Sequence, residues 1–247
     1  MPSPGQSPVQ LDRRFEYPPV RGHPHPLSRA AEVGHRLPLS YDELVFEAVK
    51  FDERGLVPCV AQDAATGEVL TLAYASEESL QLTVETGEVH FFSRSRERIW
   101  RKGEESGNVL RLVQLRIDCD GDAIVALVEP TGPACHTGER SCFYRELGDG
   151  ARGPVAHEAL AELERTLLSR AAERPEGSYT VKLLDDPALI GEKVEEEAEE
   201  VVRAAREESD ERVAEEAADL LYHLSVLLAL REVSQSAVME VLNGRRG

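Results

Sequence analysis

The sequence has 247 residues, of which 41% are hydrophobic, and a formal net charge of −18 at pH 7. This length allows two modest domains or one large one, and the apolar fraction is sufficient for a buried core. The acidic balance argues against nucleic acid and anionic membranes as partners, and no apolar run approaches the roughly 20 residues that span a bilayer. Nucleotides remain compatible with an acidic chain, because metal ions bridge carboxylates to phosphates.

Cysteine usage and the N-terminal composition predict a cytoplasmic protein. Four cysteines are too few for a disulfide framework, and three of them cluster among aspartates, as is typical of metal ligands in a reducing compartment. The N-terminus lacks the apolar stretch of a secretory signal. Residues 1–40 hold eight of the 14 prolines and no apolar period, which predicts a mobile tail. Acidic residues in this tail disfavour an organelle transit peptide.

The segment 41–145 is predicted to be a strand-rich α+β domain. Ser40 and Glu43 have the spacing of a helix capping box, so ordered structure is expected to begin there. A helix is expected between a Ser76 cap and Gly87. The predicted strands, which are rich in apolar and β-branched residues, span residues 56–62, 69–74, 89–92, 98–101, 109–119 and 123–128.

The segment 156–247 is predicted to be an all-α domain. It follows a linker, residues 146–155, which carries three glycines and one proline. Beyond the linker, apolar residues recur with a helical period. The predicted helices span residues 156–172, 187–208 with Asp186 as the cap and Pro187 at the first position, 210–231 with Asp210 as the cap, and a short last helix that begins at Ser234.

Three aspartates alternate at positions 118, 120 and 122. In a strand, alternate side chains share one face, and three carboxylates there repel one another unless a cation neutralises them. A hard divalent ion such as Mg²⁺ suits such oxygen ligands, although a solvated acidic turn gives the same pattern. An EF-hand loop is disfavoured, because Ala123 stands where that loop requires glycine.

Three cysteines and one histidine surround the aspartates. Cys119 would point to the opposite face of the strand, so its natural partners are Cys135 and Cys142. Three thiolates suit Zn²⁺ and leave one position open for an activated water. His136, beside Cys135, is a candidate proton shuttle or fourth ligand. Buried apolar cysteines are the alternative, but Cys135 and Cys142 lie in a polar, Gly-containing loop.

A local group of basic, hydroxyl and glycine residues precedes this cluster in an otherwise acidic chain. Arginine makes forked contacts to phosphate, and glycine lets backbone amides approach it, so the group is a candidate phosphate site; an ordinary basic loop is the alternative. The candidate contacts are Ser93, Arg94, Arg96, Trp100, Lys102, Ser106 and Asn108.

The first domain resembles phosphoribosyl-AMP cyclohydrolase of histidine biosynthesis from about Val45 to Arg145. The resemblance rests on GLVPCVAQDAATGEVLTLAYAS, FFSRSR, WRKGEESGN, DCDGD and GPACHTGERSCFYR, in that order. It implies hydrolytic opening of the adenine ring between N1 and C6, with Mg²⁺ at the aspartates and Zn²⁺ at Cys119, Cys135 and Cys142. It also implies a homodimer whose zinc ligands come together across the interface. Glu105 departs from the family, which more often has threonine there, and adds negative charge near the phosphate site.

The second domain carries carboxylates at helical spacing on two successive predicted helices. Glu196, Glu197 and Glu200 lie on the first helix, and Glu216 and Asp219 lie on the second. The pairs 196 and 200, 197 and 200, and 216 and 219 each fall on one helix face, so two antiparallel helices could face these carboxylates toward each other. A solvated acidic surface is the alternative, but the second set leads directly into an apolar run.

This domain resembles phosphoribosyl-ATP pyrophosphohydrolase, of the MazG-like helical pyrophosphatases. The motifs are SYTVKLL (178–184), KVEEEAEEV (193–201) and EEAADLLYHLSVLL (215–228). The resemblance implies Mg²⁺ on all five carboxylates, with Glu197 and Glu200 also catalytic and Lys182 a phosphate contact. Together the two domains predict a bifunctional hydrolase that converts phosphoribosyl-ATP to phosphoribosyl-AMP and then opens its ring. The alternatives are a house-cleaning nucleoside triphosphate pyrophosphatase fused to a zinc-binding module, and a non-enzymatic metal-binding protein.

Overall fold

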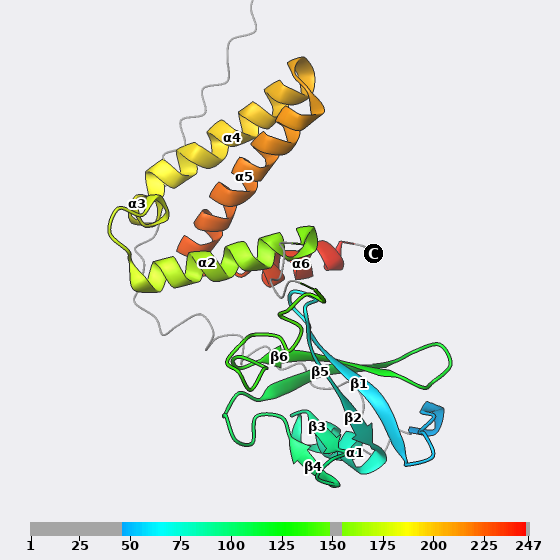
Figure 1. Ribbon diagram of the computed structural model, residues 1–247. Coiled ribbons are helices and arrows are strands. Elements are labelled where there is room, and N and C mark those ends of the chain that lie inside the picture. Colours follow the sequence, from blue (N-terminus) through cyan, green and yellow to red (C-terminus); the bar gives the residue numbers. More distant parts are fainter. Residues whose placement is uncertain (1–45, 149–154, 246–247) are drawn as a thin grey trace, which may run out of the picture.

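The computed structural model describes residues 46–148 and 155–245, and Figure 1 shows a strand-rich part followed by a helical part. The coarse prediction of two such regions in this order is confirmed. The predictions for the tail 1–40, for a cap at Ser40 and for most of the linker lie outside the described residues. In the described ranges, no helix is both long and apolar enough to cross a membrane.

The N-terminal unit is built on a six-stranded sheet with the order β4-β3-β2-β1-β6-β5. Strands β1 and β2 form the predicted antiparallel hairpin, and β1 pairs in parallel with β6. Helix α1 lies between β2 and β3, capped by Ser76 and ended by Gly87 as predicted. The elements are a 3-10 turn η4 (Phe46–Ala48), β1 (Leu56–Asp63), β2 (Val69–Ser76), α1 (Glu77–Thr86), β3 (His90–Ser93), β4 (Arg98–Arg101), β5 (Leu110–Ile117) and β6 (Ile124–Pro130).

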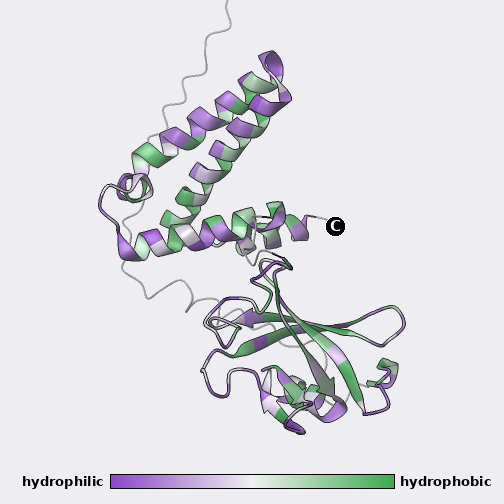
Figure 2. Cartoon of the chain, viewed as in Figure 1, coloured by the Kyte–Doolittle hydropathy of each residue, from purple (hydrophilic) through white to green (hydrophobic). Residues whose placement is uncertain are grey.

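Burial alternates from residue to residue along β1 and β6, so one face of each strand packs into the core. Val57, Leu70 and Phe91 are fully buried there. Figure 2 shows the apolar residues gathered along the strands, with polar residues in the connections. The predicted strand 109–119 is two residues too long at its C-terminal end, because β5 ends at Ile117.

The C-terminal unit is helical, and its longest helices, α4 and α5, pack against each other along their length (Figure 1). Asp186 caps α4 with Pro187 in its first turn, as predicted. The prediction that Asp210 caps α5 is wrong, because the Ser209 hydroxyl accepts the Arg212 amide and Asp210 is already helical. The elements are a 3-10 turn η5 (Ala156–Glu158), α2 (Ala159–Glu173), α3 (Tyr179–Asp185), α4 (Pro187–Glu207), α5 (Asp210–Leu230) and α6 (Gln235–Gly244).

Two glycines shape the loop that follows β4, and they differ in the space around them. Gly103 and Gly107 both have positive φ, of 92° and 78°. A Cβ atom at Gly103 would lie 2.4 Å from the main-chain oxygen of Asn108, whereas a Cβ atom at Gly107 would meet open space. The chain therefore closes on itself at Gly103.

We expect Gly103→Ala to lower the free energy of unfolding of the N-terminal unit more than Gly107→Ala does. Both substitutions bear the roughly 1–2 kcal/mol cost of a left-handed non-glycine residue, and Gly103→Ala adds about 1–3 kcal/mol of overlap with the backbone. Urea unfolding followed by the fluorescence of Trp100, the single tryptophan, measures this unit alone. Equal losses in the two variants would contradict the close approach.

Candidate active sites

The three predicted aspartates lie together in the bend between β5 and β6. One carboxylate oxygen from each of Asp118, Asp120 and Asp122 lies within 4.8 Å of the others, and all three residues are exposed. The expected strand alternation is wrong, because this segment is irregular. Asp118 accepts the Gly121 amide at 2.9 Å and the Ala123 amide at 3.2 Å. The turn, rather than a strand face, gathers the carboxylates.

The electrostatics of this bend show crowded negative charge. The charge of Asp120, followed by the hydrogen bond and charge of Asp118, raises the pKa of Asp122 above its ordinary value. Partial desolvation acts to raise the pKa of Asp118, but hydrogen bonds, the one from Ala123 foremost, hold that pKa below its ordinary value. A divalent cation would relieve this repulsion.

One chain brings two of the three predicted zinc ligands together. The Cys135 and Cys142 thiols lie close enough that each shifts the pKa of the other. Cys119 is exposed beside Asp120, with its sulfur 3.9 Å from that carboxylate, and joins no metal-ligand cluster among residues 46–148. The Thr137 hydroxyl, 3.0 Å from the Cys135 sulfur, does most to lower the pKa of Cys135, while burial raises the pKa of Cys142. His136 is exposed, with Nδ1 3.9 Å from the Cys135 sulfur.

The loop that carries these thiols is fixed to strand β2. The Cys142 amide donates to the Leu70 carbonyl at 2.7 Å, and the Ser141 hydroxyl donates to the Val69 carbonyl at 2.7 Å. Within the loop, the Cys135 amide donates to the Glu139 carbonyl at 3.0 Å. These hydrogen bonds to β2 and within the loop therefore hold both cysteines in place.

Three of the residues predicted to bind phosphate have side chains that are buried or that contact other parts of the strand-rich unit. Lys102 is buried near both thiols; desolvation lowers its pKa, and the negative charges of Cys142 and Cys135 oppose that change. The Asn108 amide donates to the Pro133 carbonyl at 3.1 Å, two residues before Cys135. Trp100 packs on Phe91 at a ring separation of 5.6 Å. Lys102 and Asn108 thus lie next to the loop that runs from Cys135 to Cys142, which we call the thiol loop.

The other predicted phosphate contacts lie nearer the surface. The Arg94 guanidinium lies 3.8 Å from the centre of the Tyr74 ring. Arg96 is exposed and lies 3.7 Å from Glu105, so Glu105 neutralises part of the positive charge of this loop. Ser93 is half-buried, and Ser106 is exposed.

Helices α4 and α5 bring three of the five predicted carboxylates together. Oxygens of Glu197, Glu200 and Glu216 lie within 4.8 Å of one another. Glu197 and Glu216 are buried, so the cluster does not match a solvated acidic surface. Arg212 forms an ion pair with Glu216, and Arg203 lies 3.2 Å from Glu200. Burial raises the pKa of Glu216, Arg212 lowers it, and Glu200 raises it further.

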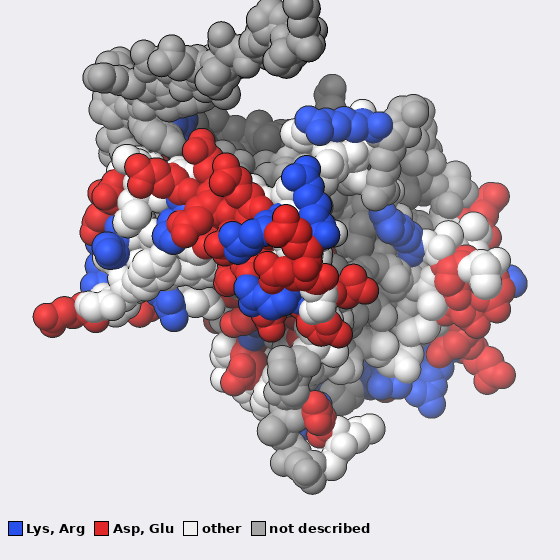
Figure 3. Space-filling view, turned by 90° about the horizontal axis from the view of Figure 1, so that it is seen from above, with Lys and Arg blue, Asp and Glu red and all other residues white. Residues whose placement is uncertain are grey.

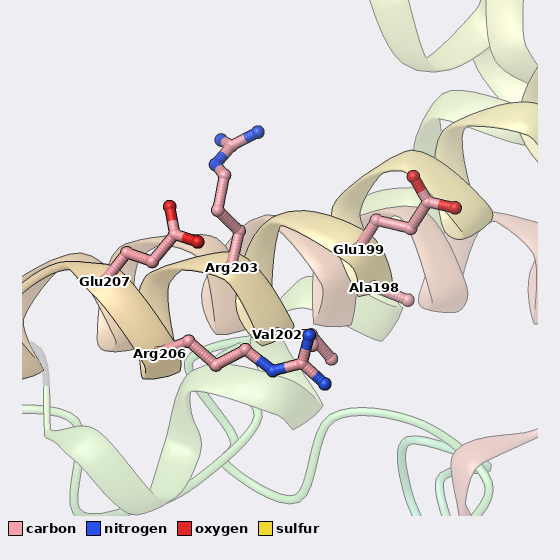
Figure 4. Close-up of a pocket in the computed structure, with 6 residues that line it drawn as sticks. All are labelled: Ala198, Glu199, Val202, Arg203, Arg206 and Glu207. Carbon is pink, nitrogen blue, oxygen red and sulfur yellow. The ribbon is translucent and has the colours of Figure 1, made fainter. Parts of the chain in front are cut away.

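The surface of the helical part carries charges of both signs. Figure 3 shows acidic side chains with basic ones between them over the helical part. A hollow on α4 is lined by Arg203 and Arg206, which leave the helix in different directions (Figure 4). Ala198, Glu199, Val202 and Glu207 also line this hollow.

The remaining predicted residues of the helical unit lie outside the three-carboxylate group. Glu196 is exposed and pairs with Lys193 at 2.5 Å. Asp219 is exposed, one turn after Glu216 on α5, and its charge contributes to the raised pKa of Glu216. Lys182 is exposed on α3.

His223 is a residue of this site that sequence reasoning did not select. It is buried, with Nδ1 3.4 Å from the Glu197 carboxylate and 3.0 Å from the Asp219 carbonyl. Its Nε2 lies 3.4 Å from the Tyr179 hydroxyl. The sequence feature that could have identified His223 is its place four positions after Asp219, as a polar residue within an apolar helical run.

Comparison with known proteins matches both units to families. Residues 71–144 match the phosphoribosyl-AMP cyclohydrolase family model, and residues 160–246 match the phosphoribosyl-ATP pyrophosphohydrolase family model. The histidine biosynthesis bifunctional protein HisIE of Bacillus subtilis is 48% identical over 200 residues, which is 81% of this chain and 95% of that protein. HisIE of Thermus thermophilus is 51% identical over 188 residues, covering 74% and 85%, and HisIE of Pyrococcus furiosus is 47% identical over 209 residues, covering 83% and 98%.

The chain belongs to the bifunctional HisIE family of histidine biosynthesis. It is a hydrolase with phosphoribosyl-AMP cyclohydrolase and phosphoribosyl-ATP pyrophosphohydrolase activities, and it acts on small-molecule nucleotides. Neither a house-cleaning pyrophosphatase nor a non-enzymatic metal-binding protein is favoured by these matches. The order of the matched segments assigns ring opening to the strand-rich unit and pyrophosphate release to the helical unit.

The thiols of this HisIE-family chain should differ sharply in reactivity. Burial raises the pKa of Cys59 to about 12, whereas Cys119 is exposed. In metal-free native protein at mildly alkaline pH, we expect a chromogenic disulfide reagent to modify Cys119 rapidly and Cys59 only on unfolding, because the thiolate is the reactive form. Cys119→Ala should remove one thiol from the fast phase, and Cys59→Ala should leave that phase unchanged. A fast phase that shrinks in Cys59→Ala would contradict this assignment.

Proposed function

We propose that ring opening takes place at a zinc site formed by Cys135 and Cys142 of one subunit and Cys119 of a second subunit. The observation that carries this proposal is the proximity of the Cys135 and Cys142 thiols, which shift each other's pKa, while Cys119 is exposed and lies outside the described metal-ligand clusters. A symmetric homodimer with this arrangement completes two sites at once. Three thiolates suit zinc, which would supply Lewis-acid activation of a water molecule.

The protein groups around the thiols have complementary roles. His136, exposed beside Cys135, would move a proton between solvent and the purine ring. Lys102 places a buried positive charge near both thiols, which favours their thiolate form. The surface residues Ser93, Arg94, Arg96 and Ser106 remain our candidates for the substrate phosphates, while Trp100 and Asn108 shape the adjoining loop.

The aspartate bend is the proposed Mg²⁺ site of the strand-rich unit. Its support is the crowding of three carboxylates, because an oxygen of each lies within 4.8 Å of the others and the charge of Asp120 raises the pKa of Asp122. Mg²⁺ takes oxygen ligands and often bridges carboxylates to phosphate. These residues would therefore help to hold phosphoribosyl-AMP.

The carboxylates between α4 and α5 are the proposed Mg²⁺ site for pyrophosphate release. The buried Glu197 and Glu216 and the half-buried Glu200 form its centre, and Asp219 and Glu196 lie exposed on the same helices. These carboxylates would hold Mg²⁺, which would supply charge neutralisation at the triphosphate and activation of water, with Glu197 and Glu200 as the proposed catalytic carboxylates. Lys182 is a proposed phosphate contact. Paired acidic helices of this kind support a MazG-like assignment for the unit.

We also propose a cytoplasmic location, which suits both the free thiols and the nucleotide substrates. The product of the helical unit, phosphoribosyl-AMP, is the substrate of the strand-rich unit. The two sites use different ligand types and distinct elements, so each reaction can be removed separately.

Single substitutions should separate the two activities. Cys135→Ala should lower ring opening by about a thousandfold or more and release zinc, because a zinc ligand is lost, while pyrophosphate release stays unchanged. Glu197→Gln should give the reverse pattern. Ring opening is measured by the ultraviolet spectrum of the base, pyrophosphate release by a phosphate assay coupled to an inorganic pyrophosphatase, and zinc by elemental analysis. Loss of both activities in a folded Cys135→Ala variant would count against two independent sites.

Subunit mixing tests the shared zinc site. Cys119→Ala and Cys135→Ala are each expected to be inactive in ring opening alone. Random assembly of equal amounts should restore about a quarter of the wild-type rate, because half of the dimers are mixed and each mixed dimer has one intact site. Mixing Cys135→Ala with Cys142→Ala is the matched control and should restore nothing. Absence of rescue in the first mixture, with subunit exchange shown by mass spectrometry, would place all three thiols in one chain.

A further inference from the structure

Two buried carboxylates flank the turn between β1 and β2. Asp63 ends β1 and Glu68 precedes β2, and their side chains are only 4% and 6% exposed. Asp63 accepts the Ala65 amide at 2.9 Å, which fixes the turn. Buried carboxylates destabilise a fold unless cations compensate them.

Arg140 supplies one compensating charge and belongs to the loop between Cys135 and Cys142. Its Nε donates to Glu68 at 2.6 Å, and its Nη2 donates to Asp63. Its main-chain carbonyl accepts the Ala134 amide at 3.0 Å, beside Cys135. The guanidinium therefore joins the turn to the backbone that holds the first thiol.

Arg165 supplies a second positive charge from the helical unit. It lies on α2, and its Nη1 is 3.8 Å from the Glu68 carboxylate that Arg140 also binds. That Nη1 atom is buried and has no hydrogen-bond partner among the described residues. Figure 1 places the β1–β2 turn beneath α2, where this contact is made. Glu68 thus lies beside two guanidiniums, one from each unit, and Arg140 also binds Asp63.

We propose that Arg140 and Arg165 are positioning residues of the thiol loop, and that docking of the helical unit through Arg165 stiffens the loop carrying Cys135. Loss of Arg165 removes charge compensation from Glu68 and weakens its hold on Arg140, because buried ion pairs depend on full compensation. Neither arginine contacts the reacting atoms. The consequence for zinc rests on the proposed function, whereas the order of the loop does not.

Hydrogen exchange in the metal-free, full-length protein tests this arrangement. In Arg165→Gln, we expect the amides of Ala134 and Cys135 to exchange about tenfold faster than in the wild type. Arg140→Gln should increase exchange at least as much. The matched control is Glu162→Gln, which removes the exposed partner that Arg165 holds at 2.6 Å and keeps the contact with Glu68. This control should leave both amides unchanged.

A chelator competition supplies the second readout, and Arg165→Gln should lose zinc more readily while its rate of pyrophosphate release stays unchanged. Arg165→Lys, which keeps the charge, should restore part of the exchange protection. Wild-type exchange in Arg165→Gln would overturn the proposal, and that variant decides the matter if Arg140→Gln does not fold. Faster exchange in Arg165→Gln together with full zinc retention in Cys135→Ala would uphold the positioning role and refute the zinc assignment instead.

Discussion

Compensation of closely spaced carboxylates is the constraint on which both units depend. Between α4 and α5, the buried Glu197 and Glu216 approach Glu200, and Arg203 and Arg212 provide counterions from the same helices. Arginine suits this task because its guanidinium stays charged and binds two acceptors at once. A metal ion bound at such a cluster would neutralise negative charge that the fold otherwise balances with its own arginine side chains. Metal binding and folding would therefore be coupled.

The helical site could be located from the sequence because its geometry is local. Glu197 and Glu200 share a face through the helical repeat, and the Asp186–Pro187 cap fixes where that helix begins. The aspartate bend shows the limit of such reasoning. Asp118 to Asp122 were assigned to a strand whose alternation would align them, yet the same clustering results from a turn stabilised by the Asp118 carboxylate.

Features that depend on contacts between distant parts of the chain could not be predicted. The contact of Arg140 with Asp63 spans 77 residues, and nothing in the local pattern around either residue indicates it. Lys102 looked like a free phosphate ligand, but the fold buries it near the thiols. His223 lies beside Glu197 only because α5 packs on α4. Sequence periodicity identifies faces of elements, whereas partners across elements require the tertiary arrangement.

In the proposed assignment, a separation of ligand types would let one chain support two metal-dependent reactions. Thiolates at Cys135 and Cys142 would favour a softer ion such as zinc, whereas the oxygen-only clusters at the aspartate bend and at Glu197 would favour magnesium. An exchange of metals between the sites would require each ion to accept poorly matched ligands. The contact of Arg165 with Glu68 adds a mechanical link between the units that leaves this chemical separation intact. The presence of both reactions in one chain therefore need not compromise the metal selectivity of either site.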